Sequence, residues 1–180
     1  MMVETTRFGS IQVEDNDIVN FPEGMLGFSK IHQYVLVERV DDSLFLWLQA
    51  LKKPSVAFPL LEPQIFELNY KVELMDEDRR LLKLNTLNCA KVFAIITIPS
   101  DPMKMTANLK APIVVNLKTR LAKQVILHNI DYPIRKGIFS DLQRHCAAKQ
   151  RTVFPDSEAS AYQAIHISEE FVETNIEENV

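Results

Sequence analysis

Side chains that bind metals or act as nucleophiles are few and widely spaced in this sequence of 180 residues. The two cysteines are Cys89 and Cys146, and the four histidines are His32, His128, His145 and His166. A zinc site needs about four ligands, usually grouped in short spacings, and these residues show no such grouping. We therefore expect two reduced thiols, no disulfide and no metal site.

Sequence signatures of catalysis and of cofactor binding are also missing. The segment EGMLG, residues 23–27, has two glycines three apart but lacks the Lys-Ser/Thr ending of a phosphate loop, and such a pair more often forms a turn. Neither Gly-x-Ser-x-Gly nor His-Glu-x-x-His occurs. Folding could bring Glu62 and Glu67 together for acid/base chemistry, but nothing in the sequence predicts it. We expect no enzymatic activity and no cofactor.

Charged residues are segregated in the last third of the chain. Residues 110–151 contain nine Lys or Arg and two Asp or Glu, a net charge of +7. Residues 152–180 contain seven Asp or Glu and no Lys or Arg, a net charge of −7. The acidic tail, residues 156–180, is predicted either to lie on the basic surface of residues 110–151 or to contribute to a partner interface. A frayed tail that only adds solubility is the third interpretation.

The basic stretch makes RNA binding the alternative function, because some small β-barrels bind RNA. Single-strand binders also use exposed aromatic side chains on which bases stack. Here the stretch offers only Tyr132 and Phe139, and the isoelectric point of the chain is about 5.6. We expect no direct binding of nucleic acid and keep a small RNA-binding β-barrel as the alternative.

Apolar runs of strand length, separated by turn residues, dominate the sequence before residue 131. The clearest alternation of apolar and polar residues covers 65–74, and further strands are predicted at 34–40, 44–50, 56–60, 92–98, 113–117 and 124–130. Pro59 predicts a sheet edge or bulge, and Asp41-Asp42 predicts a hairpin turn. The regular spacing without long helices predicts a mainly β fold, a small antiparallel β-barrel or curved sandwich.

Helical signals are short and concentrated near the C-terminus. Asp76 is predicted to cap one short helix, with the charged run 76–80 as its solvated start. Ser140 and Gln143 form a capping-box pattern for a helix of two or three turns, and apolar residues recur every four positions from Val172 to Val180. We predict a β-barrel domain over 1–136 and a partly helical, acidic C-terminal extension over 137–180.

Four segments together carry a resemblance to a known family. They are the turn FPEGMLGF at 21–28, FLWLQALKKPSVAFPLLEP at 45–63, NLKAPIVVN at 108–116, and AKQVIL at 122–127 followed by Tyr132. In order and spacing they resemble the FliW family of flagellar assembly factors over about residues 3–136. Ala50 stands where that family more often has serine, and the stretch after residue 136 has no counterpart in the compact family pattern.

The resemblance implies a non-enzymatic antiparallel β-barrel that binds two proteins. One is CsrA, the carbon storage regulator, a small dimeric RNA-binding repressor of flagellin translation; the other is flagellin. The two compete in FliW-like proteins, so that export of flagellin frees the factor to antagonise CsrA. By this resemblance we expect a chaperone-like partner of flagellin. No apolar run is long enough to span a bilayer, and no signal peptide is recognisable, so we expect a cytoplasmic protein without membrane attachment.

Six residues of the matching segments are the candidates for partner binding: Phe21, Met25, Leu26, Phe28, Asn108 and Pro112. Met25 and Leu26 lie between two glycines and are candidates for exposed apolar anchors. The alternative is structural: Phe21, Met25 and Phe28 then close the end of the barrel. Likewise Asn108, together with Gln49 and Asn116, would fasten turns through its side-chain amide.

Overall fold

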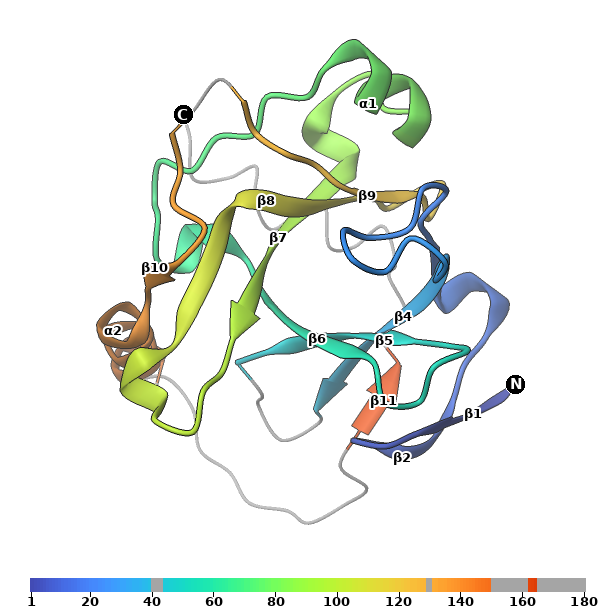
Figure 1. The fold of residues 1–180 in the computed structure, drawn as a ribbon, viewed down its shortest axis with the longest axis horizontal. Helices are drawn as coiled ribbons and strands as arrows, with labels where there is room; N and C mark the ends of the chain where they lie inside the picture. Colours follow the sequence, from blue (N-terminus) through green and yellow to red (C-terminus); the bar gives the residue numbers. More distant parts are fainter. Residues whose placement is uncertain (40–43, 129–130, 150–161, 165–180) are drawn as a thin grey trace.

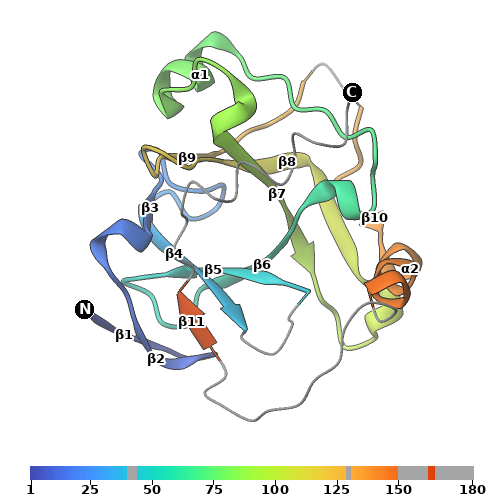
Figure 2. The same ribbon diagram turned by 180° about the vertical axis from the view of Figure 1, so that it is seen from behind.

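A computed structural model describes residues 1–39, 44–128, 131–149 and 162–164 of the protein, and strands make up most of its regular structure (Figures 1 and 2). The strands are β1 (Met2–Thr5), β2 (Gly9–Gln12), β3 (Ile18–Asn20), β4 (Gln33–Arg39), β5 (Leu46–Ala50), β6 (Ala57–Leu61), β7 (Ala90–Thr97), β8 (Thr106–Asn116), β9 (Ala122–Gln124), β10 (Lys136–Gly137) and β11 (Tyr162–Ala164). The helices are α1 (Asp76–Leu82) and α2 (Phe139–Lys149), and single 3-10 turns are η1 (Asp15–Asp17), η2 (Pro63–Ile65), η3 (Leu87–Cys89) and η4 (Pro102–Lys104).

The main sheet is antiparallel and curls into a nearly closed barrel, which confirms the predicted fold class. Its strand order is β10-β8-β7-β6-β5-β4-β11, and β3 pairs with β4 while β9 pairs with β8. Asn20 at the end of β3 forms a parallel bridge with Leu121, just before β9. The Asn20 N–H also donates to the Arg120 carbonyl oxygen at 2.8 Å. These contacts join the two ends of the curled sheet and leave fewer unpaired edges.

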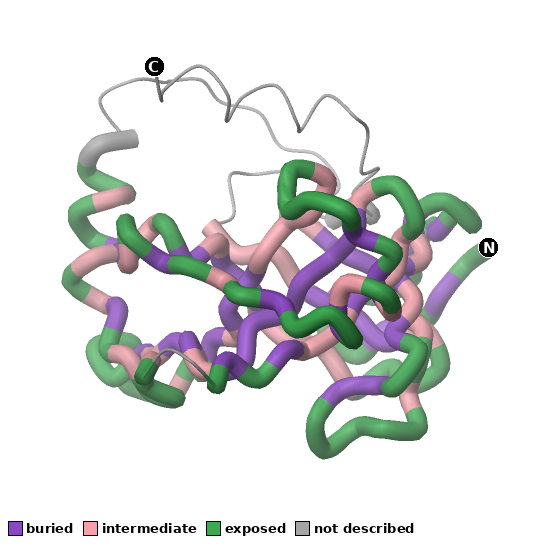
Figure 3. Tube along the Cα trace, turned by 90° about the horizontal axis from the view of Figure 1, so that it is seen from above, coloured by how far each residue is buried: buried purple, intermediate pink, exposed green. Residues whose placement is uncertain are grey.

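Apolar side chains fill the barrel and the space beneath its helices. In Figure 3, buried residues gather toward the centre of the molecule and exposed residues lie mainly on the outer turns. One cluster inside the barrel includes Val19, Leu48 and Ile113. A second lies on the α2 side and includes Leu109 and Ile138. The separate β1–β2 ribbon covers a third cluster. No helix among the described residues is both long and apolar enough to cross a membrane.

Two predicted strands are wrong. Residues 65–74 form η2 and an irregular segment, in which Phe66, Tyr70 and Leu74 are buried every four residues while Leu68 is 86% exposed. The chain turns here because the N–H groups of Phe66 and Glu67 both donate to the Pro63 carbonyl. Alternation of residue types alone could not reveal this local turn.

The strand predicted for 124–130 is also wrong beyond its start. Regular pairing ends with β9 at Gln124, and the N–H groups of Val125 and Leu127 make single hydrogen bonds to the carbonyls of Pro112 and Lys110. Pro59 lies in the part of β6 that pairs only with β5, because pairing with β7 starts at Leu60. The edge predicted for Pro59 is therefore present locally. The Asp41-Asp42 turn and the tail helix lie outside the described residues.

Helix α1 differs from its prediction in how it begins. Met75 holds the N-cap position in place of Asp76, and the buried carboxylate of Asp78 accepts a hydrogen bond from the Met75 N–H at 3.3 Å. Asp78 also pairs with Lys123 of β9 at 2.9 Å. The charged run is therefore not wholly solvated, because its third residue anchors the helix to the barrel.

Helix α2 confirms the helix predicted near the C-terminus, although it starts differently. It begins at Phe139, with the Ile138 carbonyl accepting from the Leu142 N–H at 3.0 Å, so that Ser140 lies inside the helix. Leu142 is buried in the same core cluster as Ile138, whereas Cys146 is exposed. The division into a domain 1–136 and an extension 137–180 stays a prediction.

The turn between β8 and β9 depends on one buried amide, as the structural interpretation of Asn116 expected. The Asn116 side chain donates to the carbonyl of Leu82, at 2.8 Å, and to that of Lys83, and accepts from the N–H groups of Lys118 and Thr119. It therefore ties the end of α1 to this turn. A buried polar group that has all its hydrogen-bond partners stabilises the folded protein, whereas one that has lost them destabilises it.

We predict that Asn116→Ala lowers the free energy of unfolding by about 2–3 kcal/mol, because carbonyl and N–H groups lose their partners. The midpoint of thermal unfolding should fall by about 5–10 °C. Asn69→Ala is the matched control, since Asn69 is exposed. Circular dichroism melting of both variants tests this; equal midpoints would contradict it.

The two buried tyrosines predict a stability loss at alkaline pH. Burial raises the pKa of Tyr34 to about 12, and burial together with Tyr132 raises the pKa of Tyr70 further. The contribution of the two buried tyrosines to the free energy of unfolding is therefore fully present below about pH 10, where tyrosine in the unfolded chain starts to ionise. It falls between about pH 10 and 12, because the folded side chains stay neutral there. Tyr34→Phe should reduce this fall without lowering stability at pH 7, because its hydroxyl has no partner among the described residues.

Tyr70→Phe is the contrasting variant. The Tyr70 hydroxyl donates to the Leu109 carbonyl at 2.6 Å, so its loss should cost about 1 kcal/mol already at pH 7. Urea unfolding at pH 7 and pH 11 compares the two variants. A Tyr34→Phe variant that is less stable than Tyr70→Phe at pH 7 would contradict this.

Candidate functional site

The segment between β3 and β4, residues 21–32, is a tight loop closed at its base. The Phe21 N–H donates to the His32 carbonyl at 2.7 Å, and His32 Nδ1 lies 2.9 Å from the Phe21 carbonyl oxygen. Inside the loop, the N–H groups of Gly24 and Phe28 donate to the carbonyls of Phe21 and Met25. These bonds give the loop one defined shape.

Gly24 is required at its position for two reasons. Its φ is +69°, in the left-handed region that favours glycine, and a Cβ atom added there would lie 2.7 Å from the Ser29 backbone. Ser29 cannot move away easily, because it lies between Phe28 and Ile31, whose backbone groups bond each other. The EGMLG segment is therefore a turn, as the sequence indicated.

The candidate residues of this loop divide into two pairs. Phe21 and Met25 are buried, with Phe21 packed edge-to-face on Tyr34 at a centroid distance of 5.0 Å. Leu26 is 55% exposed and Phe28 is 36% exposed, the latter resting edge-to-face on Phe58 at 5.1 Å. The burial of Phe21 and Met25 agrees with their structural interpretation, and Leu26 and Phe28 are presented at the surface. Partner binding at these four residues stays a prediction.

Strand β9 holds this loop in place through two side chains that the sequence did not single out. The Leu26 N–H donates to Gln124 Oε1 at 3.1 Å, and Gln124 Nε2 donates to the Ala111 carbonyl at 3.2 Å. Lys123 Nζ lies 2.9 Å from both a Glu23 and an Asp78 carboxylate oxygen. Burial lowers the pKa of Lys123, but its hydrogen bonds to Asp78 and Glu23 outweigh this, so the pKa is raised and the charge is retained.

Asn108 and Pro112 lie at an irregularity of β8 rather than on the loop. The Asn108 side chain accepts from the N–H groups of Lys110 and Ala111, both at 3.1 Å, where the pairing between β7 and β8 shifts register. Pro112 is buried. Asn108 therefore fastens a bend, as its structural interpretation expected, and Gln124 connects this bend to Leu26.

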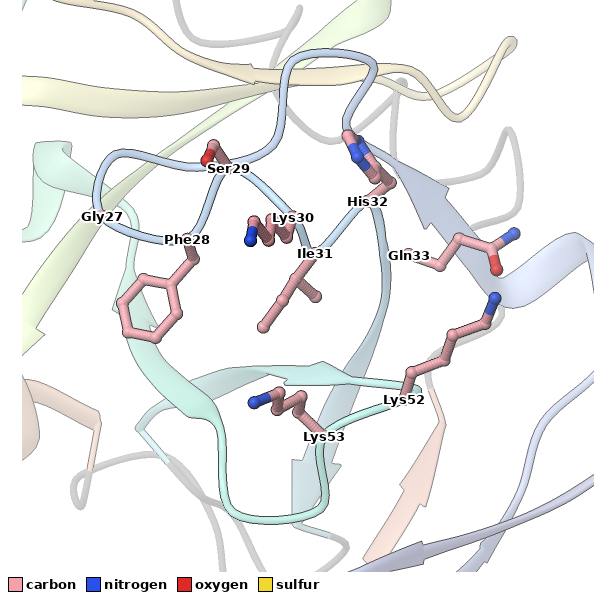
Figure 4. Close-up of a pocket in the computed structure, with 9 residues that line it drawn as sticks. All are labelled: Gly27, Phe28, Ser29, Lys30, Ile31, His32, Gln33, Lys52 and Lys53. Atoms are coloured by element: carbon pink, nitrogen blue, oxygen red, sulfur yellow. The ribbon is translucent and has the colours of Figure 1, made fainter.

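A groove of about 640 Å³ lies beside the loop and is lined by residues 27–33 and by Lys52 and Lys53 of the β5–β6 turn. In Figure 4, Phe28 and Ile31 extend from the loop toward the β5–β6 turn, from which Lys53 extends toward them. Lys30 adds a third ammonium group. The groove thus combines apolar walls with three cations and has no carboxylate in its lining.

Gln49 holds the β5–β6 turn in place. Its fully buried side chain donates from Nε2 to the carbonyl of Ala50 at 2.9 Å, and it lies 3.3 Å from those of Lys53 and Pro54. The turn-fastening interpretation of Gln49 is confirmed. The position of Lys52 and Lys53 on one side of the groove follows from this amide.

Sequence reasoning missed Gln124, Lys123 and the groove lysines. Gln124 lies in the AKQVIL segment, which was noticed only as part of a family pattern, and Lys123 was counted only within that segment and the basic stretch 110–151. The three groove lysines come from two segments about twenty residues apart, and no periodicity marks them. Among the described residues, His, Cys, Asp and Glu side chains form no group of three or more that could hold a metal ion.

Known proteins are similar to this chain in sequence and in fold. The family model described as FliW protein matches residues 2–138. A flagellar assembly factor FliW of Bdellovibrio bacteriovorus is 44% identical over 144 residues, which cover 80% of this chain and 82% of the relative. One of Ruminiclostridium cellulolyticum is 41% identical over 145 residues, which cover 80% and 98%.

A solved structure agrees with these relatives. The crystal structure of the flagellar assembly factor FliW superposes with a TM-score of 0.73 at 33% identity, covering 77% of this chain and 97% of the other. The residues matched by the family model, 2–138, include the strands β1 to β10 and the loop described above, whereas residues beyond 138 lie outside it. The chain belongs to the FliW family of flagellar assembly factors.

Proposed function

We propose that this protein acts in the cytoplasm by binding proteins rather than by catalysis, with a CsrA-type translational regulator and flagellin as its two partners. Binding of CsrA relieves repression of flagellin translation, and flagellin competes for the factor. The observation that supports this most is the pair of exposed side chains, Leu26 and Phe28, on one loop. The loop is held by its own hydrogen bonds and by the bond to Gln124 of β9, and the Phe28 ring rests on Phe58.

Rigidity is what makes this loop a suitable docking element. An apolar side chain that is already held in its bound position loses little conformational entropy when a partner covers it. Gly24, Gln124 and the closing bonds between Phe21 and His32 provide that restraint. Two isolated anchors also give moderate affinity, which suits a factor that one partner must displace from the other.

We predict that Leu26→Ser weakens binding to CsrA, to flagellin or to both by about tenfold, because burial of a leucine side chain contributes about 1.5–3 kcal/mol and Leu26 is half exposed before binding. Isothermal titration with each purified partner measures this. The fold should be unaffected, since the Leu26 side chain is not part of a core cluster.

Leu68→Ser is the matched control. Leu68 is more exposed than Leu26, and it follows Glu67, whose carboxylate pairs with Lys136 of β10, away from the loop. The control should bind both partners with unchanged affinity. Equal effects of the two variants, or no effect of Leu26→Ser on either partner, would remove Leu26 as an anchor.

We further predict the outcome with RNA, which separates this function from that of an RNA-binding barrel. Titrated with a structured flagellin leader RNA at low salt, the protein alone should leave the RNA free. Added to a CsrA–RNA complex, it should release the RNA, and flagellin should then restore the complex. Gel-shift titration records each step, and tight binding of RNA by the protein alone would favour the alternative.

A further inference from the structure

The groove lysines differ from most lysines of the basic stretch in having no carboxylate partner among the described residues. Three lysines of the basic stretch pair with carboxylates: Lys110 with Asp131, Lys123 with Glu23 and Asp78, and Lys136 with Glu67. No described residue forms an ion pair with Lys30, Lys52 or Lys53. Neighbouring carboxylates therefore offset part of the positive charge of the basic stretch, and the groove brings together three lysines that no described carboxylate offsets. Lys71, Lys83 and Lys118 also form no ion pair with a described residue, but they do not line the groove.

Strand β11 runs antiparallel to β4, toward the end of β4 that borders the groove. It pairs with β4 in the antiparallel sense, Tyr162 opposite Arg39 and Ala164 opposite Val37. The C-terminal end of β11, Ala164, therefore points toward the start of β4, and Gln33, the first residue of β4, lines the groove. The distance along β4 from Val37 to Gln33 is roughly 13 Å at a strand rise of about 3.3 Å per residue.

Strand β3 prevents the tail from continuing along the sheet edge. On one side, β4 pairs with β5, through residues that include Tyr34, Val35 and Val37. Strands β3 and β11 therefore share the other side of β4. On that side, β3 already occupies residues 33–35 of β4. The edge of β4 from Val35 to Gln33 is therefore not open to further pairing, and sixteen residues, 165–180, follow Ala164 in the sequence.

The composition of residues 165–180 complements the groove. The segment has five glutamates, Glu169, Glu170, Glu173, Glu177 and Glu178, and no Lys or Arg. Phe171, Val172 and Ile176 lie among them. Carboxylates interspersed with apolar side chains match lysines placed around Phe28 and Ile31, because both the ionic and the apolar contacts can form at once.

From this geometry we infer that residues 165–180 dock in cis in the groove formed by residues 27–33 and Lys52–Lys53, with glutamates on the lysines and apolar side chains against Phe28 and Ile31. The basic stretch 110–151 is not the binding surface of the tail. The docked tail covers Phe28, and so it shields part of the loop that presents Leu26.

Zero-length carbodiimide cross-linking of the full-length protein tests the docking without any partner. The reagent joins a lysine to a carboxylate in direct contact, and mass spectrometry identifies the pair. Tail glutamates should be joined to Lys30, Lys52 or Lys53, and about 1 M salt should reduce the yield severalfold, since it shortens the screening length to about 3 Å. The Lys136–Glu67 pair, at 2.9 Å, is the internal positive control.

Isotope mixing distinguishes docking in cis from docking on a second copy. In an equal mixture of ¹⁵N-labelled and unlabelled protein, cross-links within one molecule join peptides of the same label only. Mixed-label tail cross-links would show exchange between copies and overturn the inference. So would tail cross-links only to Lys118 or Lys136, or none at all while Lys136–Glu67 forms.

A pair of variants provides an independent measurement. Glu169→Gln with Glu170→Gln should speed hydrogen exchange of backbone amides in the groove lining at least threefold, because the tail covers them less. Asp156→Asn with Glu158→Gln removes the same charge from residues before β11 and should leave these rates unchanged. Unchanged exchange in the first variant would contradict docking.

The consequence for partners rests on the proposed function, whereas the docking does not. If CsrA or flagellin covers Phe28, the Glu169→Gln, Glu170→Gln variant should bind that partner severalfold more tightly than the wild type. Cross-links in the groove without any change in partner affinity would confirm the docking and place the partner elsewhere. Absence of the cross-links would overturn the docking and leave the Leu26→Ser prediction to be judged separately.

Discussion

The contact between Asn20 and the residues before β9 closes the barrel, and the candidate site depends on it. The Asn20 N–H donates to the Arg120 carbonyl, and Asn20 bridges Leu121, so that β3 and β9 are joined although about a hundred residues separate them. Without this contact both strands would have open edges. The loop that presents Leu26 starts at the next residue, and the side chains that hold it, Lys123 and Gln124, come from β9.

Buried amides and one shared cation do most of the fastening around the barrel. Gln49 fixes the turn with the groove lysines, Asn116 ties α1 to the β8–β9 turn, and Lys123 joins the loop to α1 through Glu23 and Asp78. Burying such groups is unfavourable unless they are hydrogen-bonded, so each one specifies a single arrangement of the segments that it connects. Loops whose shape is fixed in this way can present apolar side chains without collapsing onto them.

The distribution of charge in space differs from its distribution along the chain. Residues 110–151 have the highest net positive charge, yet carboxylates from other segments pair with several of their lysines. Three lysines that form no ion pair with a described residue lie in the groove, on the β3–β4 loop and the β5–β6 turn. Electrostatic attraction depends on distance and on screening by neighbours, neither of which a count along the sequence contains.

The sequence by itself determined the mainly β class, most of the strands and the family, because apolar runs of strand length and four spaced motifs are local features. It also indicated that Gly24 lies in a turn, and it offered turn-fastening as one of two interpretations of Gln49 and Asn116. Only the tertiary structure decided that residues 65–74 turn locally at Pro63, that Phe21 and Met25 face inward while Leu26 and Phe28 face outward, and that the groove lysines converge. The turn at Pro63 forms through hydrogen bonds three and four residues apart, which the alternation of residue types does not reveal. The other two outcomes depend on contacts between segments far apart in the chain, and so no local pattern encodes them.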